Sequence, residues 1–313
     1  MLALIASFFL LSLSVYGLPA QDILNAPRPR PLVIWHGLGD SYASSGILEF
    51  QSMIQDIHPG IFIHSVYIDP DDKEDQRATF YGNVDEQVDL VALQLANVTE
   101  LEGGFDAIGF SQGGQFLRAY VERYNTPPIY NLITFGSQHM GVADMAVCKP
   151  LDLLCRLARN AARAGVYRPW AQEHLVQAQY FRDPAQLPLY LESNRFLTSI
   201  NNELPATRNA TYARQLAALE HLVLVIFAKD KTVIPKESAW FGSYPPSEDG
   251  DDTDDEVIVP MRAQPLYQED WIGLRELDER GRVVLTSCEG EHMQLPTECW
   301  KPLVERYVGL PQS

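Results

Sequence analysis

The stretch Ala107-Ile-Gly-Phe-Ser-Gln-Gly-Gly-Gln-Phe-Leu-Arg118 decides the fold, because a single turn joins its short apolar run to a helix-forming run. Residues 109–113 fit the pattern G-x-S-x-G, in which a serine occupies a sharp strand-to-helix turn. Small residues two before and two after the serine let the neighbouring chain pass without a clash. The pattern therefore predicts that Ser111 projects from the edge of a sheet as a nucleophile.

Apolar runs on both sides of this stretch predict further strands of the same sheet. The predicted strands are Leu32–Trp35, Ile61–Val66, Phe105–Phe110, Asn131–Phe135 and Leu222–Phe227, and the predicted helices are Val84–Leu101, Gln112–Tyr124 and Thr297–Tyr307. Gly281 predicts the turn of a hairpin whose second arm is Arg282–Thr286. Strands that are apolar on both faces and alternate with helices indicate an α/β fold with a mostly parallel sheet, covered on both sides.

The pattern changes between Gln138 and Glu220, where no segment predicts a strand. This stretch is helical in character and rich in aromatic residues, which are Tyr167, Trp170, Tyr180, Phe181, Tyr190 and Phe196. We interpret residues 138–220 as an insertion over the C-terminal edge of the sheet, where such folds bind ligands. The alternative is that the aromatic side chains form only the core of the insertion. Residues 27–313 are predicted to form one domain.

The composition excludes one large class of partners. The 313 residues carry a formal net charge of -17, which argues against a nucleic-acid ligand. Seven acidic side chains lie within Glu248–Glu256, so residues 247–256 are predicted to form a solvated acidic loop. The remaining body of the protein is then only moderately acidic.

The first residues predict entry into the secretory pathway. Leu2–Tyr16 is almost wholly apolar, has no charged side chain and is followed by small residues, so residues 1–20 are predicted to be a signal peptide. The alternative is an uncleaved anchor, and no later run predicts a transmembrane segment in the mature chain. Behind a signal peptide, the sequons at Asn97 and Asn209 predict glycosylation.

The chain has four cysteines, and an even number in a secreted chain suggests two disulfides. The pairs that are close in sequence, Cys148–Cys155 and Cys288–Cys299, are the predicted ones, with free buried thiols as the alternative. No C-x-x-C spacing occurs, which disfavours a zinc ribbon or a thioredoxin-type site. We expect no metal and no cofactor.

A serine nucleophile needs a base, and the base needs an acid to hold its tautomer. In folds with this elbow the three residues occur in the order Ser, Asp or Glu, His. The histidines after Ser111 are His139, His174, His221 and His292. We predict His292 as the base because its loop follows the last predicted strand. His139, which also follows a strand, is the second choice.

Asp230 is the predicted acid, since it directly follows the strand Leu222–Phe227 and precedes His292. The alternative is that Asp230 is only an exposed turn aspartate between two lysines. Glu289 and Glu291 are rival acids, but they share the histidine's own loop, and a strand-anchored partner holds an imidazole better.

The oxyanion of an acyl-transfer intermediate requires two backbone donors. We predict the N–H groups of Gln112, which follows the nucleophile, and of Leu38, in the glycine-containing loop His36–Asp40. His36 itself is interpreted as structural.

These residues resemble the palmitoyl-protein thioesterases, lysosomal enzymes with the α/β-hydrolase fold. The matching stretches are Pro31–Ser41, Gly109–Ala119, Asn131–Ile133, Leu175–Tyr180, Trp240–Gly242 and Leu274–Gln294. The resemblance implies the same triad of Ser111, Asp230 and His292, and an oxyanion hole from Leu38 and Gln112. It also implies that the insertion forms a groove for a long acyl chain and that Cys148–Cys155 is a disulfide.

The resemblance has departures. Position 38 is leucine where animal members carry methionine, which a backbone donor tolerates. Only Asn209 lies where the family usually carries a sugar, and Cys288 and Cys299 have no reliable counterpart.

The predicted activity is hydrolysis of long-chain acyl thioesters, with S-acylated cysteines of peptides or proteins as substrates. Two alternatives remain open, namely a secreted lipase or carboxylesterase with the same triad and a non-catalytic acyl-binding protein. The resemblance places the protein in a lysosome or vacuole, or outside the cell.

Overall fold

The computed structural model describes residues 28–144, 165–246 and 257–310. Three predictions therefore lie outside the described residues, namely the signal peptide at 1–20, the Cys148–Cys155 disulfide and the acidic loop at 247–256. Among the described residues, no helix combines the length and the apolar character that crossing a membrane requires.

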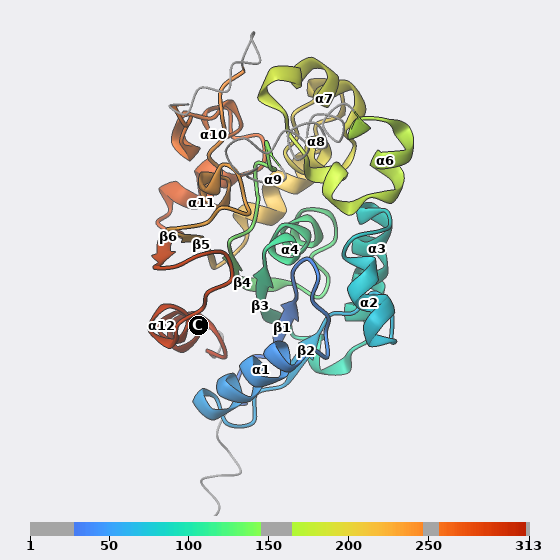
Figure 1. Ribbon diagram of the computed structural model, residues 1–313. Coiled ribbons are helices and arrows are strands. Elements are labelled where there is room, and N and C mark those ends of the chain that lie inside the picture. The colour runs from blue at the N-terminus through green and yellow to red at the C-terminus, as the bar shows by residue number, and fades with distance from the viewer. Residues whose placement is uncertain (1–27, 145–164, 247–256, 311–313) are drawn as a thin grey trace, which may run out of the picture.

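A parallel six-stranded sheet forms the centre of the molecule (Figure 1). Its strands are β1 (Leu32–Trp35), β2 (Ile63–Ser65), β3 (Phe105–Phe110), β4 (Ile129–Phe135), β5 (His221–Phe227) and β6 (Val283–Cys288). They lie in the order β2-β1-β3-β4-β5-β6, and every neighbouring pair is parallel. The carboxyl ends of all six strands consequently meet at one edge.

Alternation along each strand divides the core into two layers. Leu32 and Ile34 pack on one face of β1 with the helices α1 (Ser45–Ile57) and α12 (Thr297–Tyr307). Val33 and Trp35 pack on the other face with α3 (Val84–Ala96) and α4 (Gln112–Arg123). Both faces of the sheet are therefore covered, which is the reason its strands are apolar throughout.

The remaining helices are short. They are α2 (Asp72–Ala78), α6 (Pro169–His174), α7 (Leu187–Ser193), α8 (Phe196–Ile200), α9 (Ala210–Ala217), α10 (Pro265–Gln268) and α11 (Leu274–Glu279). Figure 1 shows α6, α7 and α8 grouped together at one end of the molecule, and α9 packs on α4. The described part of the predicted insertion is helical, as its composition indicates.

The predicted hairpin at Gly281 is wrong. Strand β6 pairs with β5 in parallel, and the segment before it is α11 rather than a strand. Gly281 has φ of 70° and closes α11, since its N–H bonds the carbonyl of Asp278 and the next N–H bonds that of Leu277. A glycine with positive φ serves both a hairpin turn and this helix-ending motif, so the residue type alone could not separate them.

A buried ion pair ties α4 to the segments around it. The Arg118 guanidinium donates to Glu122 Oε1 at 2.9 Å and to the carbonyl oxygens of His139 and Ile200, each at 3.1 Å. Both charged side chains are fully buried. Burial raises the pKa of Glu122 to about 7, although the attraction of Arg118 opposes the shift.

This pair predicts a pH-dependent stability. Between pH 4.5 and about 7 the folded chain keeps the Glu122 proton that the unfolded chain has released, so stability falls as pH rises through this window. Replacing Glu122→Gln should remove that slope, which amounts to about 1.4 kcal/mol per pH unit at most. Urea unfolding of both proteins across the window measures it. Parallel curves for the two proteins would contradict the assignment.

Candidate active site

Ser111 lies between β3 and α4 in a strained backbone conformation, with φ 51° and ψ -123°. Its N–H donates to the carbonyl of Phe135 at 2.8 Å, which ties the turn to β4. A Cβ on Gly113 would lie 2.5 Å from the carbonyl oxygen of His36, and one on Gly109 would lie 2.8 Å from the carbonyl carbon of Gly113. The glycines of the motif are thus required by close backbone approach.

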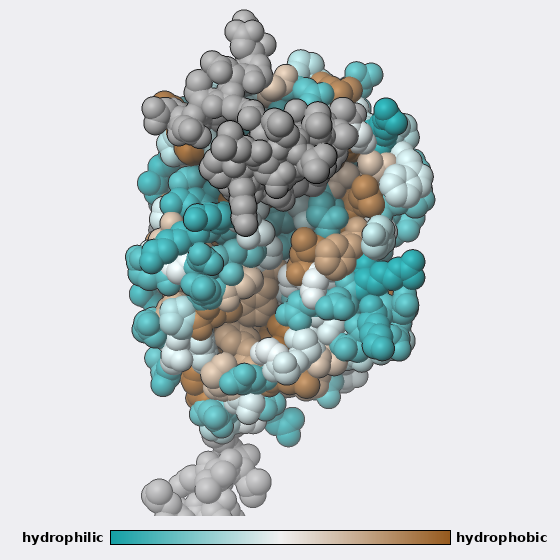
Figure 2. All heavy atoms as spheres, viewed as in Figure 1, coloured by the Kyte–Doolittle hydropathy of each residue, from teal (hydrophilic) through white to brown (hydrophobic). Residues whose placement is uncertain are grey.

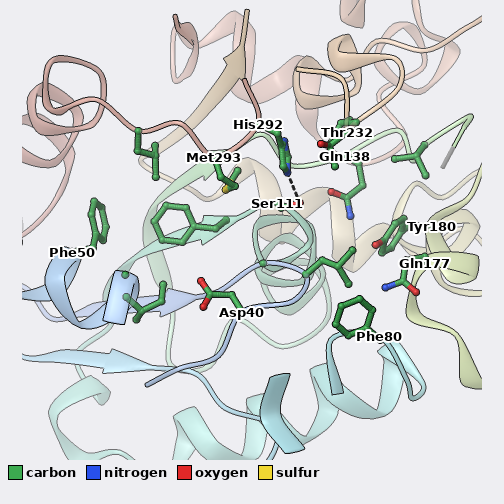
Figure 3. A pocket seen from close by; sticks show the side chains of 18 of the residues that line it. Asp40, Phe50, Phe80, Ser111, Gln138, Gln177, Tyr180, Thr232, His292 and Met293 are labelled. Carbon is green, nitrogen blue, oxygen red and sulfur yellow. Dashed lines mark hydrogen bonds between the residues drawn. The ribbon is translucent and has the colours of Figure 1, made fainter. Parts of the chain in front are cut away.

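The structure brings the three predicted side chains together in one hydrogen-bonded chain. His292 Nε2 lies 3.1 Å from Ser111 Oγ, the contact that Figure 3 shows, and His292 Nδ1 lies 2.6 Å from Asp230 Oδ2. The Asp230 side chain is 2 % exposed and that of His292 is 13 % exposed. A carboxylate buried beside Nδ1 holds the imidazole with Nε2 free to accept the serine proton.

Local contacts fix the carboxylate of Asp230. Its other oxygen, Oδ1, accepts the backbone N–H groups of Thr232 at 2.8 Å and Val233 at 3.0 Å. Lys236 Nζ donates to the carbonyl of Ala228 at 2.8 Å and closes the same turn. The side chain of Asp230 is therefore not that of an exposed turn aspartate, which was the alternative interpretation.

The other candidate bases and acids are engaged elsewhere. His139 is fully buried, stacks on Phe241 and shares a 3.0 Å hydrogen bond with Thr134. Burial, helped by the nearby Arg118, holds the pKa of His139 well below its ordinary value. The remaining candidates bond other groups or face solvent, namely His174 on Trp170, His221 on Asn131, and the exposed Glu289 and Glu291.

The loop after β1 lies against the nucleophile. A Cβ on Gly37 would be 3.2 Å from Ser111 Cβ, so this loop passes as close as a backbone can. Gln112 is the first residue of α4, a position where the N–H has no acceptor within the helix. Tyr180 donates from its hydroxyl to Gln112 Oε1 at 3.0 Å, which fixes the side chain of Gln112.

A buried pair, His36 and Asp75, also holds the loop that follows β1. His36 Nε2 lies 3.0 Å from Asp75 Oδ2, and the carboxylate also accepts the N–H groups of Tyr42 and Ile68. Burial alone would raise the pKa of Asp75, but these hydrogen bonds, that of His36 first, hold it below its ordinary value. His36 is thus structural, as the sequence suggests.

A cavity of about 630 Å³ opens onto Ser111 and His292, and Figure 2 shows an apolar hollow in the same face. Seven of its lining residues belong to the core layer of α1 and α12, namely Ile47, Phe50, Met53, Phe110, Met293, Leu295 and Trp300. It is also lined by Leu38, Phe80, Gln138, Val142, Gln177, Tyr180, Thr232 and Val233. Asp40 and Asp144 also border it. Figure 3 shows Phe50 on one side of Ser111 and Tyr180 on the other.

The walls of this cavity differ from the prediction in one respect. The insertion was expected to supply the groove for an acyl chain, and α1 and α12 also line the cavity, through Phe50, Met53 and Trp300. The i, i+3 spacing of the first two places them on one face of α1 but does not show what that face contacts. Of the aromatic residues predicted for the insertion, Tyr180 alone is among the cavity residues given above, whereas the others, Trp170 excepted, are buried in the core.

The remaining predicted positions are the two sequon asparagines and the second cysteine pair. Asn97 and Asn209 are both exposed, so their amides are reachable, and glycosylation remains a prediction. Asn209 also caps α9 through its Oδ1. Cys288 and Cys299 form the predicted disulfide, with a Cα–Cα distance of 5.4 Å.

Comparisons with known proteins agree along nearly the whole chain. A sequence model of the family described as palmitoyl protein thioesterase matches residues 31–292. The chain is 38% identical to palmitoyl-protein thioesterase 1 of Caenorhabditis elegans, covering 92% of this chain and 95% of the relative. It is 34% identical to palmitoyl-protein thioesterase 3 of Dictyostelium discoideum, covering 91% and 92%. It is 28% identical to the lysosomal thioesterase PPT2 of Homo sapiens, covering 84% and 83%.

Proposed function

The chain belongs to the palmitoyl protein thioesterase family of hydrolases, and from this premise we propose that it releases long-chain fatty acids from S-acylated cysteines through an acyl-enzyme on Ser111. The observation that carries the proposal is the hydrogen-bonded chain from Ser111 through His292 to Asp230, at the mouth of an apolar cavity. The substrates would be acylated peptides or proteins.

In the first half of the reaction, Ser111 Oγ attacks the thioester carbonyl while His292 Nε2 takes the hydroxyl proton. The carbon–sulfur bond then breaks, and the imidazolium returns the proton to the departing thiolate. A cysteine thiol has an ordinary pKa of about 8.5, so this leaving group demands less proton donation than an amine does. Asp230 stabilises the imidazolium and stays ionised.

In the second half, water attacks the acyl-enzyme with His292 again as base, and the free fatty acid leaves with Ser111 regenerated. The backbone N–H groups of Leu38 and Gln112 would stabilise the oxyanion in both halves. Their support is the contact of the Gly37 loop with Ser111 and the position of Gln112 at the start of α4.

Acyl-chain length should control the rate, because the cavity walls bury methylene groups. Each buried methylene is worth ~0.8 kcal/mol, so shortening the chain by two carbons should lower kcat/KM by up to about 15-fold. A series of acyl-cysteine peptides with 8 to 16 acyl carbons measures this dependence. A rate that is flat across the series would contradict binding of the chain in this cavity.

The proposal is tested by fatty-acid release from a palmitoyl-cysteine peptide and from the matched palmitoyl-serine ester. A faster thioester reaction supports the proposal, while a faster ester reaction would favour a lipase or carboxylesterase. Tight binding of the peptide without turnover would favour a non-catalytic acyl-binding protein. Acidic and neutral pH should both be tested, since the relatives include proteins named lysosomal.

We also propose that the protein travels through the secretory pathway to a lysosome or vacuole. Support comes from the apolar start of the sequence, the disulfide between Cys288 and Cys299, and the lysosomal names of relatives. Localisation of the tagged full chain tests this proposal.

A further inference from the structure

A single disulfide joins the two ends of the loop that carries His292. Cys288 is the last residue of β6 and is buried, and Cys299 lies in the first turn of α12. Their disulfide brings these two elements together, and His292 lies between them. The same loop supplies Met293 and Leu295 to the cavity wall.

Hydrogen bonds hold only the beginning of this loop. The carbonyls of Cys288 and Gly290 accept the N–H groups of Ala228 and Lys229, at 2.9 Å and 2.8 Å, and continue the ladder with β5. Within the described part of the chain, the main chain of residues 291–295 makes no hydrogen bond to another segment, and its bonds are local, between Glu291 and Gln294. The carbonyl of Pro296 accepts the N–H of Cys299 at 2.9 Å, at the start of α12. Backbone pairing therefore does not fix the position of the imidazole.

The backbone next to the imidazole is strained. Met293 has φ of 62°, in the left-handed region that a side chain such as methionine rarely adopts. Such a conformation persists only where the surrounding structure imposes it. Side-chain contacts also restrain this loop, namely the hydrogen bond of His292 to Asp230 and the packing of Met293 and Leu295 against the core. The disulfide adds a covalent restraint on the main chain.

From these contacts we propose that the Cys288–Cys299 disulfide is a positioning element for catalysis, which holds His292 within reach of Ser111 and Asp230. Both sulfur atoms act through the loop and touch no substrate. The inference rests on the proposed function for its turnover assay, but Ser111 reactivity measures the alignment of the imidazole independently of any thioester.

The test is the double variant Cys288→Ser/Cys299→Ser in the full chain. A misplaced catalytic group costs up to about 100-fold, so kcat on the palmitoyl peptide should fall about tenfold to a hundredfold while KM changes less than about twofold. The labelling rate of Ser111 by a fluorophosphonate should fall in parallel. Hydrogen exchange should accelerate at the N–H groups of Glu291 and Gln294, which bond within the loop, and not in the rest of the sheet edge.

A matched control separates alignment from general stability. Val304→Ala removes a buried contact of α12 on the sheet at a residue that does not itself line the cavity, and lowers stability while the disulfide stays intact. If this variant loses as much labelling rate as the cysteine double variant at equal loss of Tm, the positioning role is wrong. Unchanged kcat and labelling in the double variant would also overturn it.

Two further measurements keep the test independent of expression and of the proposed activity. Met293→Asn places a residue that tolerates positive φ beside His292, so the cysteine replacement should lower the labelling rate less in that background than in the wild type.

If the double variant does not fold, native protein is treated with a phosphine. The disulfide gains two electrons and two protons to give two thiols, and the phosphine becomes its oxide with oxygen from water. The labelling rate should then fall as thiols appear at positions 288 and 299, and an unchanged rate would overturn the proposal. Fast labelling of wild type without thioester turnover contradicts the proposed function only.

Discussion

Ser111→Ala should lower kcat for the palmitoyl-cysteine peptide by about 10⁴- to 10⁶-fold, because the replacement removes the attacking oxygen while the cavity that binds the chain is retained. KM should change little. His292→Ala should cost a similar factor, and the double variant should be no worse than either single one, since the two groups act in one proton transfer. Release of radiolabelled palmitate over hours gives the sensitivity required.

Suitable controls lie in the same loop as the histidine. Glu289→Ala and Glu291→Ala remove exposed carboxylates that bond neither Ser111 nor His292, and both variants should stay within about twofold of wild type. Should Ser111→Ala retain more than a hundredth of the wild-type rate, the nucleophile is another group and the proposed mechanism fails.

Gly113→Ala is the second substitution with a large expected effect. Its Cβ would meet the carbonyl oxygens of Trp35 and His36, which are backbone atoms that cannot rotate away. Relief requires β1 or the loop after it to move, and overpacking of this kind costs about 3 kcal/mol. We therefore expect Tm to fall by about 6–12 °C. Activity should fall further than stability explains, because the displaced loop carries Leu38.

Gly46→Ala is the matched control for that experiment. Gly46 lies in α1, and a Cβ there meets nothing within 4 Å. Alanine is the better helix former, so the Tm of this variant should not fall. Calorimetry of the two variants measures the contrast. Equal Tm values for the two variants would mean that the backbone around Gly113 accommodates a Cβ without loss of stability, which contradicts the prediction.

The sequence predicted the strands of the sheet well because burial on both faces leaves uninterrupted apolar runs. Leu32–Trp35 and Phe105–Phe110 have the predicted bounds. The strand predicted at Ile61–Val66 is shorter, as only Ile63–Ser65 pairs with β1. The predicted helix Val84–Leu101 ends at Ala96 and continues as a separate turn at Thr99–Leu101.

The candidate triad could be predicted for a topological reason. In a parallel sheet, residues that follow strands share one edge, so Ser111, Asp230 and His292 are expected at the same edge of the sheet. The loops after β5 and β6 then carry the carboxylate and the imidazole to the serine. The cavity wall from α1 was missed because Phe50 and Met53 look like ordinary core residues of an amphipathic helix. Only the three-dimensional structure shows that this helix lies beside the serine.

The order of the strands also has a consequence for the newly made chain. The serine and the imidazole are 181 positions apart, and the imidazole follows the strand at the far edge of the sheet. A polypeptide that has been made as far as Asp230 but not as far as His292 has the proposed nucleophile and carboxylate without the proposed base. Under the proposed mechanism, hydrolysis therefore begins only after β6 and its following loop have been added, and fragments that end before His292 should be inert.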